Sequence, residues 1–117
     1  MTSTMLVREG TSPRTLVAQY FRMWNSGDTS VLAELISPAW VDHAHPDLGC
    51  PAEIGKAIRR LRKREPGLRV YIDAMLGDGN VITVNGRVLA GGEFTSWVWL
   101  VRVENEQLAE MWTYSAD

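Results

Sequence analysis

Residues 80–115 read NVITVNGRVLAGGEFTSWVWLVRVENEQLAEMWTYS, and the architecture of the chain follows from this stretch. Three runs within it, 81–89, 94–103 and 108–114, are rich in β-branched and aromatic residues and contain no proline, so they predict β-strands. The pair Gly91-Gly92 joins the first two runs, and residues 104–107 join the last two. Because connections this short join only antiparallel neighbours, we predict a strongly twisted three-stranded meander.

The middle run is apolar on both of its faces. One face carries Trp97, Trp99, Val101 and Val103, and the other carries Val98, Leu100 and Arg102. A strand with two apolar faces predicts a sheet that is covered on both sides. We expect helices from the first half of the chain on one side, where a bent sheet would leave a pocket. On the outer side we expect a second copy of the chain, which makes the protein a homodimer.

Length and composition indicate one small domain. The 117 residues are 45% hydrophobic and 22% charged, which is ordinary for a soluble globular protein. A net charge of −2 argues against nucleic-acid binding, and the lack of an apolar run of about 18 residues argues against a membrane span. A lone cysteine, Cys50, favours a reducing compartment, so we expect a cytoplasmic protein. Residues 1–11 lack the apolar centre of a secretion signal; we expect a flexible tail there and a single domain over 12–117.

Local signals place three helices before the meander. Ser12-Pro13 starts the first, which carries an apolar stripe as far as Trp24 and ends at Gly27. A second, short helix is expected to include Ile36 and to stop at Pro38. A third runs from about residue 52 to residue 63. With an extended segment at 40–45 and a strand at 68–75, the predicted order is helix, helix, strand, helix and four strands, an α+β arrangement.

The third predicted helix carries a basic run. Its members are Lys56, Arg59, Arg60, Arg62, Lys63 and Arg64. They lie opposite an apolar stripe that includes Ile54 and Ile58, so we interpret them as a solvent-facing surface. No aromatic residue interleaves the run, which argues against stacking on nucleic-acid bases.

Six short phrases along the chain resemble one known family. They are VAQYF (17–21), WNSGD (24–28), WVDH (40–43), IGKAI (54–58), EPGLRV (65–70) and EMW (110–112). In their order and spacing, residues 13–117 resemble the SnoaL-like polyketide cyclases of the nuclear-transport-factor-two-like (NTF2-like) superfamily. The resemblance implies a cystatin-like α+β barrel, in which a cone-shaped, curved antiparallel sheet wraps around the first helix. It also implies a pocket inside the cone and dimers formed through the outer sheet face.

Family activities include aldol cyclisation, ketosteroid isomerisation, dehydration and epoxide opening, and many members are not enzymes. This chain departs from the larger members in its short connection between Ala90 and Phe94. The cyclases tend to place an acid/base aspartate four residues after the tryptophan that matches Trp112. Here Ala116 holds that position, and the aspartate is Asp117, one residue later.

Three residues are candidates for acid/base catalysis. By resemblance, His43 lines the pocket mouth at a position that holds the general base in ketosteroid isomerases, and an imidazole transfers protons near neutral pH. Its neighbour Asp42 points the opposite way on a regular strand, so we expect a surface or capping contact for it. Asp117 is a second acid/base candidate. Tyr20 offers a hydroxyl from the first helix that could polarise a carbonyl group.

A further set of side chains is predicted to bind the substrate. It comprises Trp24, Trp40, His45, Asn85, Trp97, Trp99, Trp112 and Tyr114. The aromatic members could form a cage for a flat ligand, and the alternative for each tryptophan is plain core packing or a dimer contact. His43, His45 and Asp47 match no strong metal-binding spacing, so we expect neither a metal nor another cofactor.

Together these features favour a cofactor-independent cyclase or isomerase that acts by acid/base chemistry on an apolar, carbonyl-bearing, polyketide-like metabolite. The alternative is a non-catalytic ligand-binding or assembly domain of the same fold. Epoxide hydrolysis is a weaker third hypothesis, because it calls for an Asp-Arg-Asp group around one water molecule. The predicted pocket strands supply only Arg87 and Arg102 for such a group.

Overall fold

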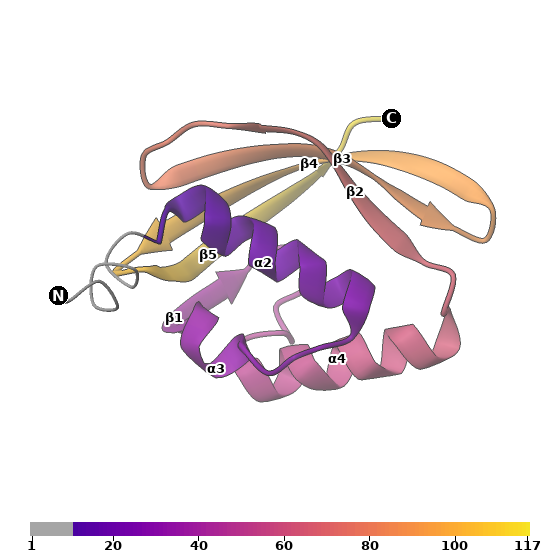
Figure 1. Cartoon of the computed structure of the whole chain (residues 1–117), viewed down its shortest axis with the longest axis horizontal. Helices are drawn as coiled ribbons and strands as arrows, with labels where there is room; N and C mark the ends of the chain where they lie inside the picture. The colour runs from indigo at the N-terminus through magenta and orange to yellow at the C-terminus, as the bar shows by residue number, and fades with distance from the viewer. Residues whose placement is uncertain (1–10) are drawn as a thin grey trace, which may run out of the picture.

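The computed structural model of the chain describes residues 11–117 (Figure 1). Its elements are α2 (Pro13–Ser26), α3 (Leu32–Leu35), β1 (Ile36–Asp42), α4 (Pro51–Arg64), β2 (Arg69–Leu76), β3 (Val81–Ala90), β4 (Glu93–Glu104) and β5 (Gln107–Ser115). The predicted order of elements and the α+β class are both confirmed. The tail predicted for residues 1–11 lies outside the described residues, apart from Thr11.

The five strands form one curved, open sheet in the order β1-β5-β4-β3-β2. The predicted meander is present, since β3, β4 and β5 pair antiparallel with their neighbours in sequence. β2 pairs antiparallel with β3, and β1 lies parallel to β5 at the opposite edge. Figure 1 shows the sheet arching over α2, with α4 on the far side of that helix. The sheet therefore has a concave face toward the helices and an outer face away from them.

Two tight turns hold the meander together. Gly91 and Gly92 have φ angles of 59° and 81°, and Asn105 and Glu106 have φ angles of 52° and 61°. Two consecutive left-handed residues match the right-handed twist of the flanking strands, which is why such turns are common in β-hairpins. Glycine adopts this conformation without strain, whereas Glu106 adopts it at some cost.

The capping signals of α2 act as the sequence predicts. The Ser12 hydroxyl accepts a hydrogen bond from the Thr15 N–H at 3.1 Å, and Pro13 occupies the first turn. Gly27, at φ 80°, ends the helix and donates its N–H to the Met23 carbonyl at 2.8 Å. The predicted apolar stripe faces the sheet: Tyr20 within it is 2% exposed, and Trp24 at its end is partly buried. Within the described part of the chain, every helix falls short of the length and apolarity needed to cross a bilayer.

The second helix is shorter than predicted. Ile36 was expected inside it, but the residue starts β1, and the α3 helix contains only four residues. Pro38 does not end a helix; it lies within β1, where the register with β5 shifts between Ile36 and Val41. A proline is tolerated there because β1 is an edge strand, so a missing N–H breaks no central ladder.

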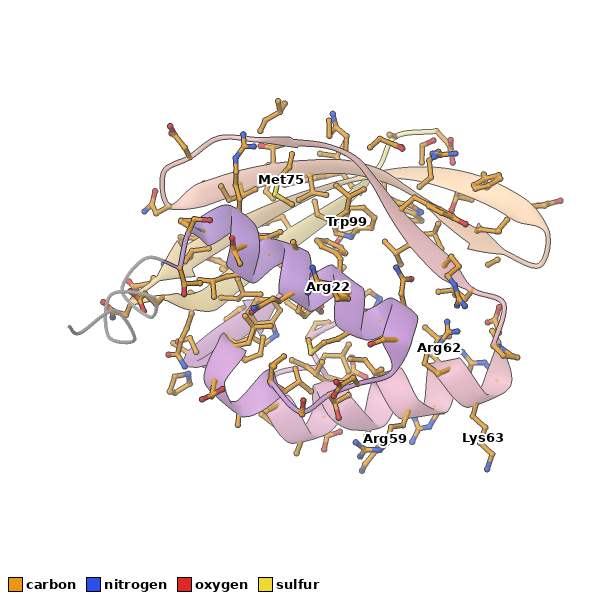
Figure 2. All side chains as sticks on the ribbon, viewed as in Figure 1. Arg22, Arg59, Arg62, Lys63, Met75 and Trp99 are labelled. Carbon is orange, nitrogen blue, oxygen red and sulfur yellow. The ribbon has the colours of Figure 1, made fainter. Side chains whose placement is uncertain are left out.

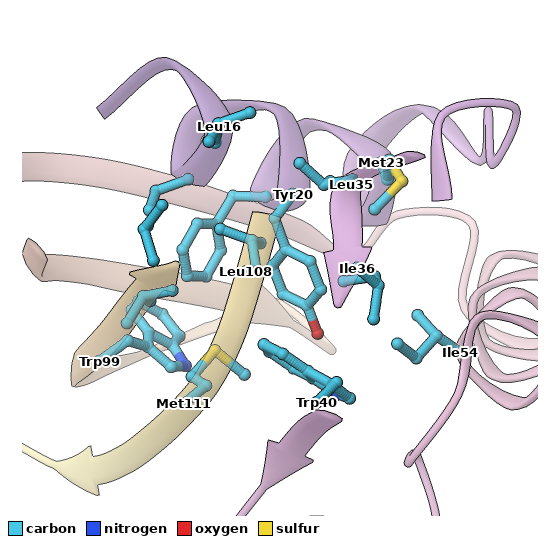
Figure 3. Close-up of a cluster of buried hydrophobic side chains, with 14 of the residues drawn as sticks. Leu16, Tyr20, Met23, Leu35, Ile36, Trp40, Ile54, Trp99, Leu108 and Met111 are labelled. Carbon is cyan, nitrogen blue, oxygen red and sulfur yellow. The ribbon is translucent and has the colours of Figure 1, made fainter. Parts of the chain in front are cut away.

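The hydrophobic core lies between the concave sheet face and the helices (Figure 3). Tyr20, Trp40, Trp99 and Met111 are all under 10% exposed and gather beneath α2. Trp40 was predicted to bind substrate, but it belongs to this core. Its indole N–H donates to the Leu48 carbonyl at 2.9 Å, which ties β1 to the loop before α4.

Candidate functional site

A pocket of about 660 Å³ lies between the concave sheet face, α2 and α4. Its walls come from α2, from the loop after β1, from α4 and from strands β2 to β5. Five of the residues predicted from the sequence line it: Tyr20, Trp24, His45, Trp97 and Trp99. The two tryptophans of β4 go together to the inner face, because residues 97 and 99 share one side of the strand.

Asp42 is the buried acid of this pocket. Its side chain is almost fully shielded, and the residue is 2% exposed. One carboxylate oxygen, Oδ1, accepts hydrogen bonds from the N–H groups of Ala44 and His45, each at 3.1 Å. The other oxygen, Oδ2, lies 3.6 Å from Nδ1 of His45, whose side chain is 59% exposed. The surface or capping contact expected for Asp42 is wrong, because its carboxylate is buried and bonds a turn that precedes no helix directly.

His43 does not line the pocket. Its Nε2 lies 2.6 Å from Oε2 of Glu110, and its ring stacks on Trp112 with the ring centres 5.0 Å apart. Glu110 also accepts a hydrogen bond from Arg102 at 3.0 Å, so this cluster belongs to the outer sheet face. The His43 N–H still bonds the Met111 carbonyl, at 3.0 Å, and continues the ladder beyond β1. Strand alternation then places His43 on the face opposite Asp42, and the expectation that the imidazole lines the pocket is wrong.

Four other predicted site residues also lie outside the pocket. Asp117 follows the end of β5, and its Oδ2 accepts the Ser96 N–H at 3.0 Å at the edge of the meander. Asn85 and Tyr114 lie across from Val98 on either side of β4, on the outer face. Trp112 stacks on His43 on that same face. Strand alternation puts Asn85, Trp112 and Tyr114 on the outer side of the sheet, whereas Asp117 lies beyond the last residue of β5.

The pocket is also lined by polar residues that the sequence analysis did not assign to it. Arg60 and Arg64 line it from α4, although the basic run was interpreted as a solvent-facing surface. Thr113 lines it from β5, and within residues 11–117 its Oγ1 is the one buried side-chain oxygen or nitrogen without a hydrogen-bond partner. Leaving such an atom unpaired costs roughly 1–3 kcal/mol. Strand alternation could have identified Thr113, because it lies two residues after Met111 and therefore shares the inner face of β5 with it.

The electrostatics of the two sheet faces differ. In the pocket, burial raises the pKa of Tyr20 far above its ordinary value; a hydrogen bond with Trp24 opposes the rise, and the nearby Asp42 carboxylate adds to it. Tyr20 therefore stays a neutral phenol that can donate a hydrogen bond. On the outer face, the hydrogen bond from His43, followed by that from Arg102, holds the pKa of Glu110 below its ordinary value. Among the described residues, no three His, Cys, Asp or Glu side chains gather in a way that would hold a metal ion.

A curved, open sheet that wraps around a helix and leaves a pocket between them defines the NTF2-like class of α+β folds. Residues 17–111 match the family model described as the SnoaL-like domain, so the chain belongs to the SnoaL-like domain family. No curated protein matches the chain in sequence.

Solved structures share the fold at low sequence identity. IdmH from Streptomyces antibioticus superposes with a TM-score of 0.72 at 18% identity, over 89% of this chain and 91% of that one. A SnoaL-like polyketide cyclase from Agrobacterium tumefaciens gives a TM-score of 0.71 at 9% identity, over 88% and 90% of the two chains. An NTF2-like protein of unknown function from Cytophaga hutchinsonii gives 0.67 at 11% identity, over 89% of each chain. Similarity at this level supports the fold and leaves the activity to be argued from the pocket.

Proposed function

We propose that this protein is a small, cofactor-independent cyclase or isomerase in which Asp42 transfers a proton on an apolar, carbonyl-bearing, polyketide-like substrate. The observation that supports this most is the buried carboxylate of Asp42 in the wall of a largely apolar pocket, with Oδ2 3.6 Å from His45. Membership of the SnoaL-like family supports a cyclase- or isomerase-type reaction in general.

The two oxygens of Asp42 have different surroundings. Oδ1 accepts two backbone N–H groups, which fix the orientation of the carboxylate. Oδ2 takes up the proton when a C–H bond next to the substrate carbonyl breaks, and the electron pair of that bond moves into an enolate. In one outcome the enolate carbon attacks a second carbonyl and closes a ring, and Asp42 returns its proton to the alkoxide that forms. In the other, a different carbon of the conjugated enolate takes the proton back from Asp42. A carboxylate in the pocket wall lies within reach of a substrate bound there, which is the geometric requirement for a general base.

The enolate oxygen needs hydrogen-bond donors. Tyr20 supplies a neutral phenol from α2, and the Thr113 hydroxyl is buried with no partner of its own. Both residues line the pocket that also contains Asp42. Donors that are already oriented toward developing charge lower the barrier without reorganisation of solvent. His45, half in solvent beside Oδ2, exchanges protons between Asp42 and water.

The alternative is a non-catalytic binding domain. It is favoured by the same contacts of Oδ1, because an aspartate that accepts two N–H groups of its own turn also has a purely structural role. A binding domain and an enzyme differ in turnover, so the two hypotheses are separated by a reaction and not by affinity.

The test uses methyl 6-acetyl-2-naphthoate, a flat, neutral aryl ketone, as the probe. In D₂O an active-site base exchanges the methyl-ketone hydrogens for deuterium, and mass spectrometry measures the rate. Asp42→Asn keeps an oxygen for the two backbone N–H groups and removes the base, so we expect exchange to fall about 10²- to 10⁴-fold. Asp117→Asn, an acid outside the pocket, is the control and should keep the wild-type rate. Exchange by Asp42→Asn at the wild-type rate would contradict Asp42 as the base, and no exchange by the wild type would favour the binding domain.

A further inference from the structure

Charge is distributed unevenly in this chain. Helix α4 contains six of the 12 lysine and arginine residues and one of the 14 acidic residues, Glu53. It therefore carries a net charge of +5 (six less one), and the rest of the chain carries −7 (the total of −2 less 5). A concentrated positive field beside a pocket attracts anions to it.

The cations of α4 have three different environments. Arg62 is structural, because its guanidinium donates to the carbonyls of Leu68 and Pro66, both at 2.6 Å. Arg59 and Lys63 project away from the body of the molecule, below α4 in Figure 2. Arg60 and Arg64 line the pocket. They are four residues apart, so they lie on the same face of the helix, one turn from each other.

Arg60 and Arg64 are paired less closely than Arg87 and Arg102. On the outer sheet face Arg87 pairs with Asp73 at 2.9 Å, and Arg102 pairs with Glu110 at 3.0 Å. Within residues 11–117, Arg60 forms no ion pair or hydrogen bond, and Arg64 has only an exposed contact with Glu65 at 3.8 Å. Two like charges one helical turn apart repel each other, and an anion between them would remove that repulsion.

We propose that Arg60 and Arg64 form a carboxylate-binding subsite at the mouth of the pocket, and that the substrate is an acid as well as a ketone. This inference rests on the proposed function and adds the chemical class of its substrate. The guanidinium fork binds a carboxylate through two parallel hydrogen bonds. Asp42 at the end of β1 and Asp47 in the loop after it line the same pocket and repel a carboxylate, so they fix the direction of the ligand. Its acid end lies at α4, and its reactive carbonyl lies at Asp42.

Calorimetric titration of the full chain tests the subsite without any turnover. The probes are 6-acetyl-2-naphthoate and its methyl ester, which differ only in the charge of one group. We expect the acid to bind at least about tenfold more tightly, with an affinity that falls as salt rises. The double variant Arg60→Gln/Arg64→Gln should bind the acid no better than the ester. The control Arg59→Gln/Lys63→Gln removes the same charge from the exposed side of α4 and should keep most of the preference.

Equal affinity for acid and ester in the wild type, or no measurable binding of the acid, would overturn the subsite. An equal loss of preference in the control variant would also overturn it, because attraction would then come from the general field of α4. The subsite and the proposed function fail separately. Exchange that depends on Asp42 but is equal for acid and ester would support the proposed function and refute the subsite. Tighter binding of the acid without any exchange would support the subsite and refute the proposed function.

Discussion

The side chains of Asp42 and His43 lie on opposite faces of the sheet, although the two residues are neighbours in the chain. Asp42 is buried against the pocket, whereas His43 bonds Glu110 on the outer face at 2.6 Å. The register of β1 with β5 produces this division, because Asp42 lies beside Met111, which faces inward. Within residues 11–117 an acid and an imidazole meet at two places, and of these two pairs Asp42–His45 is the one in the pocket.

Replacement of Thr113 should separate stability from function. Its Oγ1 is buried without a partner, so Thr113→Val removes a desolvated hydroxyl at nearly constant volume. We expect the free energy of unfolding to rise by roughly 1 kcal/mol, measured by urea denaturation. Because the proposal gives this hydroxyl to the enolate oxygen, deuterium exchange of the ketone probe should fall at the same time. A variant that is less stable than the wild type would contradict the assignment of Thr113 as unpaired.

Acid sensitivity should depend on Glu110. Its pKa is lower in the folded chain than in the unfolded chain, mainly through the hydrogen bond from His43. The folded state therefore gains stability above the ordinary value of 4.5, and this gain is lost as the pH falls through the lower folded value. Glu110→Gln should flatten the fall in urea midpoint between neutral pH and about pH 3, relative to the wild type. Parallel curves for the wild type and Glu110→Gln would refute this linkage.

Gly86 has no side chain, and this leaves room for Trp99, which lines the pocket. A Cβ at this position would collide with the Tyr71 carbonyl oxygen, and it would lie 3.0 Å from the ring of Trp99. The Tyr71 carbonyl is held in the sheet and cannot move without distorting it, so Gly86→Ala should destabilise the fold by about 1–3 kcal/mol. The added methyl group should also change the fluorescence of Trp99. Gly67→Ala is the matched control, because nothing lies within 4 Å of its added Cβ. Equal stability of the two variants would show that the sheet relaxes at Gly86.

The outer sheet face is where we expect a second copy of the chain. Tyr71, Phe94 and Tyr114 are between 40% and 54% exposed on it, and Leu100 lies across from Trp112 near its centre. Burying such a surface would favour association, so sedimentation should give a dimer at micromolar concentration. Leu100→Glu should give a monomer that still binds the ketone probe, since its side chain faces away from the pocket. A wild-type protein that sediments only as a monomer would rule out this interface.

Much of the fold was predictable because its signals are local. Alternation in residues 81–114 defines the strands of the meander, and glycine pairs and caps define where elements turn. The same alternation puts Trp97 and Val98 on opposite faces of the sheet, but it leaves open which of the two faces inward. Ile36 was misassigned because a short apolar run before a proline fits a helix end and an edge strand equally well.

The site was less predictable because it depends on long-range register. Alternation shows that Asp42 and His43 face opposite ways, but only pairing with β5, almost 70 residues later in the chain, decides which of them faces inward. Helical periodicity likewise separates the apolar and basic faces of α4. Periodicity does not reveal that Arg60 and Arg64, on the basic face, also line the pocket.

The decisive measurement is the rate of deuterium exchange on the ketone probe for Asp42→Asn and His43→Ala, side by side with the wild type. If Asp42 is the pocket base, its variant loses about 10²-fold or more, while His43→Ala stays within a few-fold of the wild type. A collapse in His43→Ala with full activity in Asp42→Asn would contradict the assignment of the base to the inner face of the sheet.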